Sequence, residues 1–345
     1  MTALALPRRR IPVVLPSRRD PRLKLSAVIV SLQILGQAGL GFKVSIAQIL
    51  VSIAVCAVID VGVVLKRQGV LAWPASGLLT GNSIGFILRA SGTQHGDWWS
   101  LHGIHFFVLA AVVAMASKHL IRPGHRHVFN PSNVALVLCL LVIGPAYVFP
   151  QYLWWGSMSL PLGLAVAVIA VGAAVILTTV RMIGMALAFL ATFAALIAAF
   201  ALAGRSFVAI WHDGAIAGLD YWLYICTSPE LFVFVFFMMS DPQTAPRSTA
   251  GRVGYGVATA AVAAALLVVQ TTEFGVKLAI LAALTLVCAA PVLARFVQGR
   301  SWRRPPAAVL AAGLIAATAA VGTISLAGNE QLTYIERGLT GRNPQ

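Results

Sequence analysis

The segment from His125 to Asn133 has the sequence HRHVFNPSN and lies between two long apolar runs. Asn130 followed by Pro131 predicts the start of a helix, because asparagine is a preferred N-cap and proline at the first helical position loses no hydrogen bond. The apolar run 134–148 follows at once. We therefore expect a helix that begins at the edge of a membrane, with its positive end free to hold an anion or a polar ring. An ordinary capped helix is the simpler interpretation of the same residues.

The composition decides the broad class of protein. Of the 345 residues, 59% are hydrophobic and 10% are charged, and the mean hydropathy is +0.88. A soluble domain carries about 25% charged residues, so the sequence predicts an all-α, polytopic membrane protein embedded in a lipid bilayer. The formal net charge is +15, but the basic residues fall in loops between apolar runs. This pattern indicates membrane orientation, and we expect no nucleic-acid partner.

Ten or eleven transmembrane helices are expected, since a spanning helix needs about 20 residues. We predict one transmembrane domain over 25–327, a disordered basic tail over 1–24 and a polar tail over 328–345. The predicted spans are 25–42, 44–65, 76–89, 103–121, 131–149, 159–180, 182–203, 217–240, 253–270, 275–296 and 306–327.

The orientation follows from the basic residues. Placing the N-terminus in the cytoplasm puts most of the 25 Lys and Arg residues on the cytoplasmic side, as the positive-inside rule requires. We therefore expect a multi-pass protein of the cytoplasmic (inner) membrane. The run 76–89 is short, but a re-entrant segment there would reverse every later assignment, so we favour a crossing.

Polar residues inside predicted spans are costly and therefore informative. Thr80, Gly81, Asn82 and Ser83 interrupt the third span, and they fit either a binding site or close packing of helices through small residues. Asp60 is expected to pair with Lys66 or Arg67, one or two turns further on.

Two further kinds of residue lie in spans. Glu230 falls in the first turn of a broken eighth span and is a candidate proton or cation site. Asp60 and Glu230 are the only intramembrane charges expected, which argues against a proton-coupled pump. We expect the four cysteines to be small buried residues rather than disulfide or metal ligands, because they have no C-x-x-C spacing: Cys56, Cys139, Cys226 and Cys288.

A second polar segment, MMSDPQTAPR, covers residues 238–247 and ends an aromatic run. Asp241-Pro242 repeats the pattern of Asn130-Pro131, a capping side chain followed by proline. Short, interrupted apolar segments in both halves of a chain indicate an inverted-repeat fold with a site between the halves.

Three of these motifs resemble the NqrB/RnfD membrane subunits, the flavin-carrying subunits of the sodium-pumping NADH:quinone reductase and of the Rnf ferredoxin:NAD complex. The motifs are LLTG at 78–81, HVFNPS at 127–132 and MMSDPQT at 238–244. The likeness covers roughly residues 70–260. The longer pattern from Leu79 to Asn133 is most similar to the RnfD-like membrane proteins of enediyne biosynthesis.

The resemblance implies two inverted five-helix repeats, related in shape to urea channels, with a non-covalent flavin between helices. It places Thr80, His127 and Asn130 in contact with that flavin, and the Asp-Pro-x-Thr element in an architectural or cofactor-adjacent role. With the neighbouring polar and aromatic residues, the expected cofactor-binding set is Thr80, Asn82, His127, Phe129, Asn130, Asn133, Asp241 and Thr244.

The sequence departs from the redox subunits at one point. Those subunits attach FMN to a threonine in a Ser-Gly-Ala-Thr motif, whereas the corresponding loop here, 154–161, reads WWGSMSLP. We therefore expect one non-covalent flavin, riboflavin or FMN, and no covalent FMN. The chain has no glycine-rich dinucleotide loop, so electrons would come from a separate redox or biosynthetic protein. A small-molecule channel or exporter on the same scaffold, and a membrane anchor for a biosynthetic complex, are the alternatives.

Overall fold

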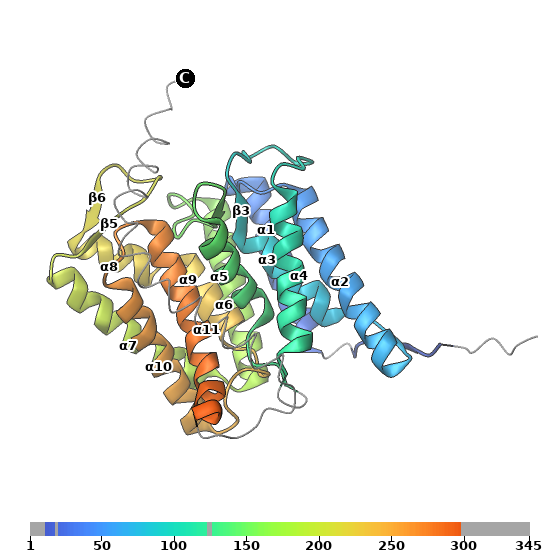
Figure 1. The fold of residues 1–345 in the computed structure, drawn as a ribbon. Helices are drawn as coiled ribbons and strands as arrows, with labels where there is room; N and C mark the ends of the chain where they lie inside the picture. Colours follow the sequence, from blue (N-terminus) through green and yellow to red (C-terminus); the bar gives the residue numbers. More distant parts are fainter. Residues whose placement is uncertain (1–10, 18–19, 123–125, 298–345) are drawn as a thin grey trace, which may run out of the picture.

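The structure is a computed structural model that describes residues 11–17, 20–122 and 126–297, with side chains up to residue 294. The described chain is an all-α polytopic membrane protein (Figure 1). Its helices are α1 (Pro21–Gly39), α2 (Ile46–Gln68), α3 (Ala75–Ile87), α4 (Ile104–Leu120), α5 (Pro131–Ile143), α6 (Leu160–Val180), α7 (Ile183–Leu202), α8 (Gly218–Cys226), α9 (Pro229–Val233), the π-helix η1 (Phe234–Met238), α10 (Thr249–Leu267) and α11 (Glu273–Val297).

Short strands close the two ends of the bundle. β1 (Val13–Val14) pairs in parallel with β2 (Leu71–Ala72) at one end, which we call the N-terminal face. At the other end, the opposite face, β3 (Leu88–Ala90) pairs with β4 (Val148–Pro150) and β5 (Ser206–Val208) pairs with β6 (Ala215–Ala217), both antiparallel.

The first ten predicted spans all correspond to helices, and the eleventh, 306–327, lies outside the described residues, as does the tail 328–345. Within the described part of the chain, six segments are long and apolar enough to cross a membrane, and α4 and α5 are shorter apolar helices. The eighth span is broken as predicted. Ser228 starts a new helix there, with its hydroxyl accepting a hydrogen bond from the Leu231 N–H at 3.0 Å.

The short helix α3 crosses from one face to the other. It follows β2 at the N-terminal face and leads into β3 at the opposite face. Its 13 residues span about 20 Å, and the three extended residues of β3 add about 10 Å. Together they come to about the 30 Å of the hydrocarbon core of a bilayer, a length that agrees with the predicted crossing.

Glycines hold α3 against α2. A Cβ atom added at Gly81 would lie 2.4 Å from the carbonyl oxygen of Ser52, and one added at Gly77 would lie 2.8 Å from that of Cys56. Because every fourth residue returns to the same side of a helix, Gly85 continues the contact one turn on, 2.9 Å from the Cα of Ile49. Gly81 therefore serves close helix packing, the second of the two interpretations of this segment.

The helices form two halves with the same order of contacts. In the first half α2 packs against α3 and α4, and α4 packs against α5; in the second half α7 packs against α8 and α10, and α10 packs against α11. The halves meet through α1 with α6 and through α5 with α11. In Figure 1, α2, α3 and α4 lie on one side, α7, α8 and α10 on the other, and α5, α6 and α11 between them. This is the arrangement expected of a five-helix repeat.

The N-terminal tail is shorter than predicted. Residues 1–10 and 18–19 lie outside the described residues, but Val13–Val14 form β1 and α1 already begins at Pro21. The physical reason is a helix start that the sequence contains: the Asp20 side chain accepts a hydrogen bond from the Arg22 N–H at 2.9 Å, and Pro21 occupies the first helical position.

Candidate functional site

The start of α5 is the capped helix that the sequence predicted. The side-chain oxygen of Asn130 accepts hydrogen bonds from the backbone N–H of Asn133, at 3.1 Å, and from the hydroxyl of Ser132, at 2.9 Å. Pro131 is the first helical residue. The N-terminus of α5 is therefore satisfied from within its own first turn.

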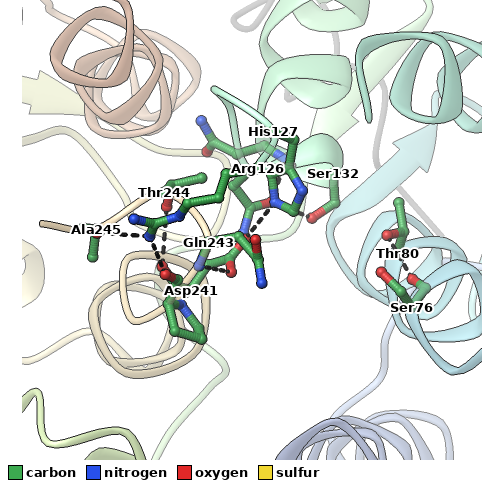
Figure 2. Close-up of polar contacts among 12 residues, drawn as sticks. Ser76, Thr80, Arg126, His127, Ser132, Asp241, Gln243, Thr244 and Ala245 are labelled. Carbon is green, nitrogen blue, oxygen red and sulfur yellow. Dashed lines mark hydrogen bonds and ion pairs between the residues drawn. The ribbon is translucent and has the colours of Figure 1, made fainter. Parts of the chain in front are cut away.

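The same segment binds the second polar motif, which lies more than a hundred residues further along the chain. The Asn130 amide donates to the carbonyl oxygen of Met238 at 3.2 Å, and His127 Nε2 lies 3.0 Å from Asp241 Oδ2. The Arg126 guanidinium donates to the carbonyl oxygen of Ala245 at 3.0 Å and also to that of Pro242. We call these contacts between residues 126–130 and residues 238–245 the polar lock, and Figure 2 shows Arg126 and His127 beside Asp241 and Ala245. His125, the first residue of the quoted segment, lies outside the described residues.

Asp241 and Thr244 build a turn rather than a helix start. The Asp241 side chain accepts a hydrogen bond from the Gln243 N–H at 2.9 Å, and the Thr244 hydroxyl donates to the Asp241 carbonyl oxygen at 3.2 Å. The next helix, α10, begins only at Thr249, with Ser248 as its N-cap. The prediction that Asp241-Pro242 starts a helix, as Asn130-Pro131 does, is therefore wrong. The Gln243 N–H bonds the Asp241 side chain within a turn instead. Asp241 instead orients His127.

The predicted residues on α3 are separate from the lock. The Thr80 hydroxyl donates to the carbonyl oxygen of Ser76 at 2.8 Å, so it is bonded within its own helix, and Figure 2 shows this pair apart from the lock residues. Asn82 is only 3% exposed, and neither polar atom of its side chain has a hydrogen-bond partner among the described residues. Such a group is costly in a bilayer unless a ligand or water satisfies it.

Asn133 and Phe129 complete the predicted set. The Asn133 amide donates to the Leu281 carbonyl oxygen at 2.9 Å and to the Thr285 hydroxyl at 3.0 Å, and so joins α5 to α11. Its side-chain oxygen has no partner in the described part of the chain. Phe129 is buried in the apolar core. The structure therefore unites His127, Asn130, Asp241 and Thr244 and leaves free polar atoms on Asn82 and Asn133.

Among the cavities between the described residues, two small ones are both lined by Ile87 of α3 and Met238 of η1. Their volumes are about 20 Å³ and about 10 Å³, so the larger holds one water molecule. Ligand pockets have volumes of roughly 300–1,000 Å³. The amide of Asn82 and the side-chain oxygen of Asn133 match a donor and acceptors on the edge of a flavin ring. Neither residue lines these two cavities, and the helices are too closely packed in this conformation to admit such a ring.

The partners of the buried carboxylate of Asp60 differ from those that the sequence predicts. Asp60 is held by Lys118, at 2.8 Å, and by His119, at 3.1 Å, not by Lys66 or Arg67, because α4 packs alongside α2 and brings the end of α4 to the carboxylate. The other carboxylate oxygen of Asp60 accepts the Gly77 N–H at 3.0 Å and so fixes the start of α3.

The interior also contains charges in the second half and at the opposite face. Beyond Asp60 and Glu230, the side chains of Arg89, Lys118, Glu273 and Lys277 are at least nine-tenths buried. The expectation of only two intramembrane charges is therefore wrong, and so is the argument drawn from it against proton coupling. The four-residue spacing of Glu273 and Lys277 within an apolar run was the available signal. The four cysteines are free and buried, as predicted.

No protein-family model and no curated protein matches the chain. The fold and the site define its class: an integral membrane protein with all-α spans, short and broken helices in both halves, and a polar junction between those halves.

Proposed function

We propose that the chain is a flavin-binding electron-transfer component of the membrane, of the NqrB/RnfD type, that serves a biosynthetic pathway such as that of an enediyne. The observation that carries the proposal is the junction of the halves. There α3 packs against α5, and Ile87 of α3 lines the same two cavities as Met238 of η1. Both polar side-chain atoms of Asn82 and the side-chain oxygen of Asn133 have no partner among the described residues.

The residues of the junction divide into two roles under this proposal. Asn82 offers a free donor and a free acceptor to a polar ring edge, and Asn133 offers a free acceptor. His127, Asn130 and Asp241 keep the start of α5 in place through the lock. A flavin supplies the electron chemistry, and the protein supplies burial, orientation and hydrogen bonds. Because the cavities are small, binding requires α3 to move away from η1.

The orientation and the partners belong to the same proposal. The N-terminal face carries most of the described basic residues near its loops, which supports a cytoplasmic N-terminal face in the inner membrane. These residues are Lys66, Arg67, Lys118, Arg122, Arg126, Arg181, Arg247 and Arg252. A separate redox or biosynthetic protein then delivers electrons at that face.

The test is an absorbance spectrum of the detergent-purified protein, expressed with excess riboflavin, before and after acid precipitation. We expect flavin bands that pass into the supernatant, because the attachment is non-covalent. Asn82→Leu should remove them, whereas Gln243→Leu, which changes an exposed amide next to Asp241, should keep them. A colourless wild-type protein contradicts the proposal, and bands in the pellet contradict non-covalent binding.

A second function is favoured by the two cavities, which flank Ile87 and Met238 between the halves. A small neutral solute could pass along this line if the two side chains moved, as in a channel or exporter. In that case Met238→Ala should speed the swelling of vesicles in a urea gradient. Leu202→Ala, at a lipid-exposed position, is the control, and equal rates for both variants and the wild type exclude this function.

A further inference from the structure

Three ionisable residues of the second half lie together in the protein interior, away from the polar lock. Glu230 on α9 and Glu273 and Lys277 on α11 have exposed fractions of 5%, 6% and 4%. Ionisable groups at such depth are rare and are usually functional. The two carboxylates and one ammonium carry a net charge of −1 when all three are ionised.

The two carboxylates differ in how they are bonded. Both oxygens of Glu273 have donors, since Oε1 accepts the Leu153 N–H at 2.5 Å and Oε2 accepts the indole N–H of Trp211 at 2.9 Å. Glu230 forms one hydrogen bond, with the Lys277 ammonium, 3.2 Å from its Oε2, and the indole of Trp155 also lies close to its carboxylate. Its Oε1 has no hydrogen-bond partner among the described residues. Glu273 therefore connects α11 to the loops of Leu153 and Trp211. The Oε1 atom of Glu230, by contrast, accepts no hydrogen bond from the described residues.

Glu230 and Lys277 line the larger cavity. Its volume of about 20 Å³ holds one water molecule, which finds polar partners only at these two side chains of the lining. The rest of the lining is apolar and includes Leu153, which follows β4 at the opposite face. The free oxygen of Glu230 is an available acceptor for a water in this place.

The chain breaks where Glu230 lies. α8 ends at Cys226, Ser228 begins α9, and the π-helix η1 follows at Phe234. Breaks of this kind place functional groups near the middle of the membrane in transport proteins, and π-helical turns are frequent at functional sites.

We propose that Glu230 is a proton-binding site in the membrane interior, which exchanges its proton with water through the cavity that it shares with Lys277. The proton passes from a hydronium ion to the free Oε1 of Glu230 and leaves a water molecule behind. Protonation weakens the bond to Lys277, whose ammonium then has Glu273, one helical turn away, as its remaining carboxylate neighbour. The charged groups that face Glu230 are Lys277 and Glu273, and Arg89 faces these two in turn.

A proton fits this site better than a metal cation does. Metal ions such as Ca²⁺ and Mg²⁺ need six or more oxygen ligands, whereas the cavity offers one free carboxylate oxygen and an ammonium group that repels cations. One proton also cancels the net charge of the three residues. The proposal is independent of the flavin, because none of these residues belongs to the lock or to the amides of the junction.

The test is infrared difference spectroscopy of the full chain in lipid vesicles, between neutral and acidic buffer. We expect a C=O stretching band of a protonated carboxyl in apolar surroundings, which shifts in D₂O because water reaches the site. Glu230→Gln should abolish that band, and Asp220→Asn, at an exposed carboxylate, should leave it at full intensity. The amide band of the helices reports that each variant remains folded.

Either of two results overturns the proposal. One is the absence of such a band at every pH at which the helices remain intact. The other is a band that persists in Glu230→Gln or that does not shift in D₂O, since the carboxyl would then be another residue or sealed from water. The double variant Glu230→Gln/Lys277→Gln repeats the test without a buried charge in this pair.

Discussion

The polar lock at the N-terminal face and the Glu230–Lys277 pair in the interior both join distant parts of the chain, but they differ in how fully their polar groups are bonded. In the lock, the Asn130 amide and Asp241 use both of their polar ends. In the pair, Glu230 has one bonded and one free oxygen beside a cavity.

The difference distinguishes buried polar groups that stabilise the fold from buried polar groups that can bind a ligand. Fully bonded buried groups specify one arrangement of the chain and leave nothing for a ligand. A free buried oxygen carries a desolvation cost that only a ligand, a proton or a water can offset. By this criterion the lock residues His127, Asn130 and Asp241 position α5. Asn82 and Glu230, which have unbonded polar atoms, are the candidates for binding a ligand or a proton.

The largest effect is expected from Lys277→Met, which leaves two buried carboxylates without the ammonium. Breaking a buried ion pair costs about 3–5 kcal/mol, so the thermal unfolding midpoint in detergent should fall steeply. Glu230→Gln/Lys277→Met should recover most of the loss, because it removes the unpaired charge. If the double variant is as unstable as the single one, the pair does not behave as a coupled unit.

Asp241→Ala should have the next largest effect, because it leaves His127 without its partner and opens the turn at 241–244. An unsatisfied buried donor costs about 1–3 kcal/mol. The same unfolding assay measures the loss, with Asp213→Ala as the control at an exposed carboxylate. Equal stability of the two variants would show that the lock adds nothing to the junction.

Asn130 allows the cap and the lock to be separated. Asn130→Ala removes both the N-cap, which contributes about 1 kcal/mol, and the bond to the Met238 carbonyl oxygen. Asn130→Asp keeps a good cap but has no amide to donate, so it should lose only the second part. An aspartate variant as stable as the wild type in unfolding experiments would assign the whole effect to the cap.

The smallest effect on stability is expected from Asn82→Leu. The amide has no hydrogen bond to lose among the described residues, so an apolar side chain of similar size should change the unfolding midpoint little or raise it. Flavin content, measured on the same samples, should fall. A marked loss of stability in ligand-free protein would show that Asn82 has a structural partner and belongs with the lock.

The sequence by itself determined the class of protein and most of its helices. Apolar runs of about 20 residues can be stable in a bilayer only as helices, because every backbone polar group must be bonded internally. Local signals likewise located the start of α5 at Asn130-Pro131 and the break at Ser228, since caps depend on neighbouring residues alone.

Only the tertiary structure decided which polar groups meet. The sequence predicts that Asp60 pairs with Lys66 or Arg67 on its own helix, whereas the observed partners are Lys118 and His119 of α4. The sequence places Glu230 inside a predicted span, but it does not identify the partner, Lys277, which lies 47 residues further along the chain. Pairings of this kind depend on the packing of helices from different parts of the chain. The residues next to each partner in the sequence do not specify them. The lock and the proton site are for that reason properties of the fold.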